Sequence, residues 1–174
     1  DAWTAKTAGH RVISATNSWL SAQTQRNHLQ EDMNRGFVCT FSAMVLKGRS
    51  AHIFHIGDSR IFRVVSGSLE QLTSDHRTVL SSTESYLLRA LGLSTEVEIE
   101  YRELNLRPGD IFVMTTDGVH DYVSARDIAR LASLSDDLDG TARSIVENAL
   151  ENGSDDNLTI QIVQIDNLPR RDAM

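Results

Sequence analysis

Three short acidic clusters, each next to an apolar run, are the residues of this chain whose types and spacing could perform chemistry. Gly57-Asp58-Ser59-Arg60 follows the apolar run 53–56, and Thr116-Asp117-Gly118 follows the run 111–114. Asp155-Asp156-Asn157 instead precedes the apolar stretch that begins at residue 158. Carboxylates at strand ends can converge on one point, and convergent carboxylates hold hard cations. The clusters therefore indicate a cation site.

Each cluster taken alone also fits a simpler interpretation. Gly and Asp both favour tight turns, so Gly57-Asp58 and Asp117-Gly118 are also typical of plain turns. Asp155-Asp156-Asn157 is likewise compatible with a solvated loop that opens a strand. The order, the spacing and the flanking apolar runs of all three clusters together favour the cation site.

Composition and charge limit the class of protein. The 174 residues fit one domain with a sizeable core, with 40% hydrophobic and 24% charged residues. A net charge of -7 argues against a broad attraction to nucleic acid or anionic membranes, although bound divalent metal reverses the sign of the potential locally. Cys39 is the only cysteine, which favours a reducing compartment and a cytoplasmic location. No apolar run approaches the length of a membrane span.

Apolar periodicity and turn residues predict the secondary structure. Helical spacing runs from about Thr4 to Gln25, and the polar stretch 73–93 becomes helical around Ser85, Leu88, Ala90 and Leu91. Two later helices are predicted at 124–134 and 138–152. The predicted strands are 37–46, 51–57, 60–65, 69–72, 96–104, 111–116 and 157–165. Strands and helices occur in separate blocks, which favours an α+β fold over an alternating doubly wound sheet.

The clusters and their surroundings resemble the metal-dependent Ser/Thr protein phosphatases of the type 2C (PPM) family. The similarity covers essentially the whole chain from Phe37 to Ile165, with all elements in order. The matching segments are Gly57-Asp58-Ser59-Arg60, Leu72-Thr73-Ser74-Asp75-His76, Arg89-Ala90-Leu91-Gly92, Gly109-Asp110, Thr115-Thr116-Asp117-Gly118-Val119-His120-Asp121 and Asp156-Asn157-Leu158-Thr159.

The resemblance implies roles for three aspartates and a cofactor. Asp117 and Asp156 correspond to ligands of a dinuclear Mn²⁺ or Mg²⁺ centre, and Asp58 corresponds to a ligand of an additional, weaker metal. In such enzymes two metal ions activate a water that attacks phosphorus in line. The implied function is hydrolysis of phosphoserine and phosphothreonine in proteins, with Asp117 and Asp156 as the catalytic pair.

One departure from the family pattern concerns the start of the chain. The family's first metal-bridging motif is an Asp-Gly followed by further glycines, with an Arg upstream, and nothing of that kind precedes the helix at Thr4. We therefore interpret the chain as the C-terminal portion of the phosphatase domain, without its opening strands. We expect this portion alone to hold one ion weakly at Asp117 and Asp156 and not to support dinuclear chemistry.

The resemblance also implies the architecture and the partners. The expected fold is a four-layer α-β-β-α sandwich of antiparallel sheets, with residues 1–167 as the phosphatase portion and 168–174 as a tail or linker. The segments around Trp19, His55 and Asp117 are similar to bacterial phosphatase domains fused ahead of a protein kinase domain. The expected partners are a phosphorylated protein substrate and a fused or partner Ser/Thr kinase.

Two alternatives remain open from the sequence. A non-catalytic, phosphatase-like module could regulate a partner kinase by contact, because the bridging aspartate is absent from this chain. A plain structural domain with acidic turns is the other. Two further signals carry little weight: Asp139 lacks the preceding strand of a haloacid dehalogenase motif, and Cys39 lacks the following Arg of a tyrosine phosphatase loop.

Overall fold

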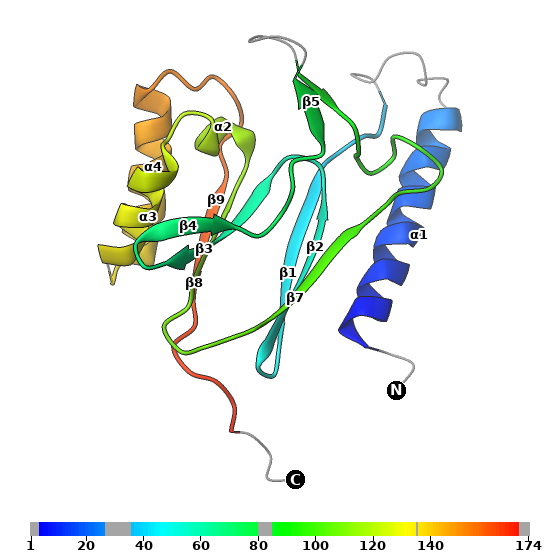
Figure 1. Ribbon diagram of the computed structural model, residues 1–174. Helices are drawn as coiled ribbons and strands as arrows, with labels where there is room; N and C mark the ends of the chain where they lie inside the picture. Colours follow the sequence, from blue (N-terminus) through cyan, green and yellow to red (C-terminus); the bar gives the residue numbers. More distant parts are fainter. Residues whose placement is uncertain (1–3, 27–35, 80–84, 135, 171–174) are drawn as a thin grey trace. The chain divides into compact units, whose positions relative to one another are not determined.

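The computed structural model describes residues 4–26, 36–79, 85–134 and 136–170. The chain forms two compact units, each assembled from segments that are far apart in the sequence (Figure 1). Unit 1 comprises residues 1–47, 51–58 and 75–104, and unit 2 comprises residues 48–50, 59–74 and 105–174. No helix in the described part of the chain combines the length and apolar character needed to span a membrane.

Unit 1 packs one long helix on a three-stranded sheet. The helix α1 (Ala5–Arg26) confirms the helix predicted from Thr4 to Gln25. The sheet has the order β1 (Phe41–Lys47), β2 (Ser50–Ile56) and β7 (Glu100–Asn105). The central strand β2 is buried along nearly its whole length, and the buried residues include the polar side chains of His52 and His55. The core of the unit consists of Ile13, Phe54, Ile56 and Leu91.

Two polar or small residues of α1 fix the helix within unit 1. Gly9 lies directly against the ring of Phe54, so that any larger side chain at this position would overlap the ring. Asn17 is buried, and its side-chain amide donates to Ser94 O at 3.0 Å while its Oδ1 accepts from Gly92 N at 2.8 Å. A buried amide with both ends bonded stabilises this arrangement, because leaving either end unpaired is costly.

The helix predicted around Ser85, Leu88, Ala90 and Leu91 is wrong. The structure has instead a two-stranded antiparallel pair, β5 (Arg77–Val79) and β6 (Ser85–Leu87), followed by extended chain. Leu91 exchanges two backbone hydrogen bonds with Cys39, at 2.8 and 3.1 Å. This long-range pairing satisfies the backbone groups that a helix would satisfy locally, and Gly92 then turns the chain with a φ of 79°.

Unit 2 packs two helices on a four-stranded antiparallel sheet. The strand order is β4 (Ser68–Gln71), β3 (Arg60–Val65), β8 (Ile111–Thr115) and β9 (Ile160–Gln164). The helices are α3 (Ala125–Leu134) and α4 (Leu138–Glu151), and a short helix α2 (Asp117–His120) follows β8. The core of this unit contains Phe62, Val113, Val119, Val123, Ile128, Ala132, Ile145 and Ala149.

The four strands predicted between residues 37 and 72 are divided between the two sheets. The first two, β1 and β2, belong to unit 1, and the next two, β3 and β4, belong to unit 2. The first of them begins at Phe41 rather than Phe37, and the last predicted strand begins at Ile160 rather than Asn157. Each unit nevertheless packs helical structure on an antiparallel sheet, as the α+β prediction requires.

Candidate metal site

The strand β8 carries Asp117 to the edge of the unit 2 sheet. It lies between β3 and β9, and its residues Phe112 and Val113 are fully buried. The strand ends at Thr115, and Thr116, with extended backbone dihedrals, precedes α2, whose first residue is Asp117. The carboxylate of Asp117 therefore extends from a rigid, fully paired strand end, which is a favourable place for a group that must hold a fixed direction.

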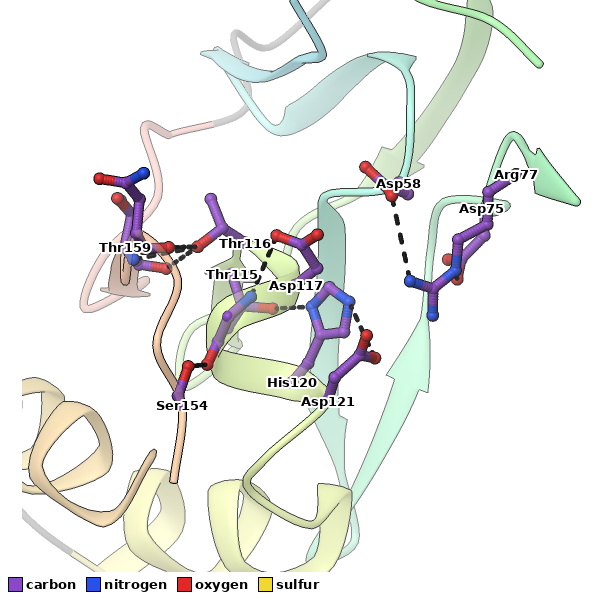
Figure 2. Close-up of polar contacts among 12 residues, drawn as sticks. Asp58, Asp75, Arg77, Thr115, Thr116, Asp117, His120, Asp121, Ser154 and Thr159 are labelled. Carbon is purple, nitrogen blue, oxygen red and sulfur yellow. Dashed lines mark hydrogen bonds and ion pairs between the residues drawn. The ribbon is translucent and has the colours of Figure 1, made fainter. Parts of the chain in front are cut away.

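Thr116 ties the end of β8 to the loop that precedes β9 (Figure 2). Its Oγ1 accepts from Thr159 N–H at 3.0 Å and donates to Asn157 O at 3.1 Å, and its N–H donates to Thr159 O at 3.1 Å. Because these bonds hold residues 157–159 against Thr116, the neighbouring residues Asp156 and Asp117 come to the same side of the unit.

The absence of a side chain at Gly118 allows α2 and the 156–158 loop to approach closely. A Cβ at this position would lie 2.8 Å from Asn157 O and 3.2 Å from Asp156 Cβ. On the other side, buried Ser154 donates its hydroxyl to Gly118 O at 2.8 Å. The glycine in the Asp117-Gly118 motif is therefore explained by packing of the site rather than by an unusual backbone angle.

Four aspartates line one pocket in unit 2. The pocket has a volume of about 350 Å³ and is lined by Asp117, Gly118, Asp121, Tyr122, Asp155 and Asp156. Asp117 Oδ1 accepts from Gly118 N–H at 3.0 Å, and Asp156 Oδ1 accepts from Asn157 N–H at 2.7 Å. Each of these two carboxylates is thus oriented through one oxygen by the amide that follows it.

The donor set of this pocket fits a hard divalent cation. No basic side chain is among the described residues that line it, and within the described segments neither Asp117 nor Asp156 forms an ion pair with a basic group. Asp121 Oδ1 lies 3.8 Å from His120 Nε2. Carboxylates held close together repel one another, and a cation bound between them removes that repulsion. Carboxylate oxygens are also the ligands that Mg²⁺ and Mn²⁺ prefer.

Asp58 belongs to unit 1 and is described there. It follows Gly57 at the end of β2, and its Oδ2 lies 4.0 Å from Arg77 Nη1. Arg77 Nε in turn lies 3.5 Å from Asp75 Oδ2 (Figure 2). The structure therefore brings Asp117 and Asp156 together as predicted, whereas the convergence of Asp58 with them stays a prediction.

Asp121 and Asp155 line the pocket although sequence reasoning did not select them as site residues. Asp121 is four residues after Asp117, and its N–H donates to Asp117 O at 3.0 Å. The two residues are therefore one helical turn apart and lie on the same face of the turn. A short helix after β8 would have predicted this placement, but its four residues give no periodic signal. Asp155 is adjacent to Asp156 in the acidic cluster that the sequence does show.

A first prediction concerns the Thr116 hydroxyl. We expect Thr116→Val to lower the free energy of unfolding by about 1 kcal/mol, because Thr159 N–H and Asn157 O lose their partner while the shape is retained. Urea denaturation measures this change. Thr116→Ser keeps the hydroxyl and is the matched control, so equal losses in the Val and Ser variants would contradict the role given to the hydrogen bonds.

A second prediction concerns acid stability through His76 in unit 1. Burial lowers the pKa of His76 below 6.5, with smaller contributions from the nearby His55 and Arg89, opposed by Glu100. The unfolded chain therefore binds a proton more readily than the folded one near this pH, so that stability falls as the pH drops below about 6.5. We expect the melting temperature to decrease from about pH 7.5 to pH 5.5 and the decrease to be smaller in His76→Asn, which does not titrate. Equal slopes for both proteins would contradict the assignment to His76.

Comparison with known proteins identifies relatives of the chain. The sequence pattern of the Protein phosphatase 2C family matches residues 3–159. The chain is 28% identical over 170 residues to serine/threonine protein phosphatase PstP of Mycobacterium tuberculosis, covering 88% of this chain and 32% of PstP. It is 25% identical over 164 residues to protein phosphatase PhpP of Streptococcus pneumoniae, covering 84% of this chain and 67% of PhpP. The chain thus spans about a third of the length of PstP.

Solved structures show the same fold. The crystal structure of the M. tuberculosis phosphatase PstP/Ppp superposes with a TM-score of 0.79 at 26% identity, covering 96% of this chain and 74% of that one. The catalytic domain of PstP in complex with two manganese ions gives a TM-score of 0.73 at 26% identity, covering 87% and 67% of the two chains. Together with the pattern match over residues 3–159, this similarity shows that the chain belongs to the Protein phosphatase 2C family.

Proposed function

We propose that this chain is part of a metal-dependent protein phosphatase that hydrolyses phosphoserine and phosphothreonine. The observation that carries the proposal is the pocket in which Asp117 and Asp156 lie together with two further aspartates. The similarity to proteins named as Ser/Thr protein phosphatases supports the reaction class. A pocket with four aspartates in its lining attracts the phosphate dianion poorly by itself, so a bound cation is required to make the local potential positive.

We assign the metal ligands to the aspartates that the sequence singled out. Asp117 and Asp156 are proposed to hold Mn²⁺ or Mg²⁺, and Asp58 is proposed to hold an additional ion. When bound, such metals lower the pKa of a coordinated water and neutralise phosphate oxygens. The amides of Gly118 and Asn157 orient the two carboxylates, and Thr116 keeps the segments that carry them in register. Asp121 and Asp155 add negative potential that favours cation entry.

The proposed partners follow from the same chemistry. The substrate is a phosphorylated protein, and a Ser/Thr kinase, fused to this chain or separate, is the proposed source of that phosphorylation. The single cysteine is compatible with the proposed cytoplasmic location. We keep 1–167 as the proposed phosphatase portion and 168–174 as the proposed tail or linker.

Hydrolysis of a phosphothreonine peptide by the full-length gene product tests the proposal. We expect release of phosphate that requires Mn²⁺ or Mg²⁺ and that stops when the metal is chelated. A rise in the melting temperature with Mn²⁺ concentration reports binding independently of turnover. Mn²⁺-dependent stabilisation without any hydrolysis would instead favour the non-catalytic regulatory module. If Mn²⁺ causes neither stabilisation nor hydrolysis, the remaining interpretation is a structural domain with acidic turns.

A further inference from the structure

The segment Asp75-His76-Arg77 of unit 1 holds the turn at Gly57 and Asp58 by contacts to both residues. His76 N–H donates to Gly57 O at 2.8 Å, and Gly57 N–H donates to His76 Nδ1 at 3.1 Å. These two bonds run in opposite directions between the same pair of residues. The next residues on each side, Asp58 and Arg77, form the ion pair at 4.0 Å (Figure 2). The turn is therefore held by backbone, imidazole and guanidinium groups together.

The hydrogen bond from Gly57 fixes the tautomer of His76. A ring nitrogen that accepts from a backbone N–H carries no proton, so the proton of the neutral ring is on Nε2. His76 Nε2 lies 3.3 Å from Glu100 Oε2, which is a suitable acceptor for that proton. Arg89 Nη1 lies farther from the same nitrogen, at 3.5 Å, and a guanidinium cannot accept a proton, so Glu100 is the partner that suits a protonated Nε2. Burial, which lowers the pKa of His76, favours the neutral ring that this arrangement requires. Glu100 thus selects which nitrogen faces Gly57.

A metal site at this cluster is the competing interpretation. The possible ligand atoms of His55, His76 and Glu100 lie within 4.8 Å of one another. A metal on His76 Nε2 would require the proton to move to Nδ1, where it would face the N–H of Gly57. His55 Nδ1 is bonded to Ser42 Oγ at 2.8 Å, a contact that does not involve its Nε2 and is compatible with either interpretation, so the contacts of His76 decide between them. The contacts therefore favour a hydrogen-bonded support for the turn over a ligand set.

The conformation of Gly57 shows why the turn needs such support. Its φ is 113°, a conformation that residues with side chains rarely adopt, and a Cβ would overlap Thr40. Glycine adopts this conformation without steric strain, but it loses more conformational entropy on folding than any other residue. Contacts from outside the turn must therefore hold it in place. The direction in which Asp58 extends depends on these contacts.

We propose that His76 is a positioning residue for Asp58: its unprotonated Nδ1 holds Gly57 N–H, Glu100 sets the tautomer, and the Asp58 carboxylate is thereby aimed for a divalent cation. The last step rests on the metal-binding role proposed for Asp58 under the proposed function. The hydrogen-bond step stands on the contacts within unit 1 alone. His76 acts through Gly57 and not by touching substrate.

Two variants of His76 with an amide side chain, His76→Asn and His76→Gln, distinguish the role of Nδ1 from that of Nε2. The side-chain oxygen of Asn reaches the position of Nδ1, whereas the longer Gln places its amide near the position of Nε2. We expect Gly57 N–H to exchange with solvent about 10-fold faster or more in His76→Gln, because its acceptor is lost, and near the normal rate in His76→Asn. Hydrogen exchange followed by NMR measures this, with the amide of Phe54 in β2 as the internal reference.

Equal exchange of Gly57 in the Asn and Gln variants would overturn the hydrogen-bond step. Faster exchange of Gly57 and Phe54 together would also overturn it, since that pattern reports general loosening of unit 1 rather than loss of one bond. Wild-type protection of Gly57 with acceleration only in His76→Gln supports it, whatever the activity of the protein.

The Mn²⁺ dependence of activity in the full-length gene product tests the second step. We expect His76→Gln to raise the Mn²⁺ concentration for half-maximal activity about 10-fold with kcat at saturating Mn²⁺ little changed, and His76→Asn to restore it. The expected exchange pattern with an unchanged Mn²⁺ dependence would overturn the link to Asp58. If no variant and no wild-type protein hydrolyses substrate, the proposed function fails, while the exchange result still decides the role of His76 at Gly57.

Discussion

Replacing Asp117 by Asn should reduce Mn²⁺-dependent phosphatase activity about 100-fold or more in the full-length gene product. Asn keeps the size and the oxygen that accepts from Gly118 N–H, but it removes the negative charge that a divalent cation requires. The same change should reduce the Mn²⁺-induced rise in melting temperature, because binding to the folded state is weakened. Phosphate release and thermal unfolding across a Mn²⁺ series measure the two effects.

Asp166→Asn is the matched control for this charge change. Asp166 is exposed beyond the end of β9 and does not line the acidic pocket. We expect its substitution to leave both the activity and the Mn²⁺ response within about twofold of the original protein, as surface changes away from special features usually do. Comparable losses in the two variants would show that net charge, rather than the position of Asp117, determines metal binding.

Gly57→Ala should lower the free energy of unfolding by about 2–4 kcal/mol. Two effects add: the φ of 113° strains any residue with a side chain, and the new methyl group overlaps the side chain of Thr40. Thermal or urea denaturation of the purified chain measures the loss. Asp58 follows directly, so any displacement of the backbone that relieves the overlap also moves this carboxylate.

Gly48→Ala separates the two effects. Gly48 lies between β1 and β2, has a φ of 60°, and has no atom within 4 Å of the position that a Cβ would take. We expect a loss of about 1 kcal/mol there, because only the backbone conformation is unfavourable. A loss at Gly57 no larger than the loss at Gly48 would argue against the overlap with Thr40.

The sequence predicts the core of the site because its parts are local to two strand ends. Asp117 follows β8, and Asp156 precedes β9, which pairs with β8 in antiparallel register from Ile111↔Gln164 to Thr115↔Ile160. In antiparallel neighbours the end of one strand lies beside the start of the other, so the two carboxylates converge once β8 and β9 pair. Three helices separate these strands in the sequence, so the pairing itself was implied by the family resemblance and not by the order of the elements. Asp121 was missed because it depends on a four-residue helix without a periodic signal.

Features that depend on long-range contacts could not be predicted. Local spacing around Leu88 and Leu91 favours a helix, but Leu91 pairs with Cys39, a partner 52 positions away by the residue numbers. Likewise, His76 bonds to Gly57 across 19 residues. The division of the strands from 41 to 71 into two sheets also has no local signal besides the glycine at which the chain leaves β2.

The discontinuous make-up of both units has a consequence for synthesis and for engineering. Unit 1 draws its last segment from residues 75–104, and unit 2 interrupts it with residues 59–74. During synthesis on the ribosome, the three-stranded sheet of unit 1 cannot be completed until β7 has emerged. At that point β3 and β4 of unit 2 have been synthesised, but their partner strands β8 and β9 have not. No single cut of the polypeptide releases either unit intact, so fragments obtained by limited proteolysis are expected to remain associated or to aggregate rather than to behave as separate mini-domains.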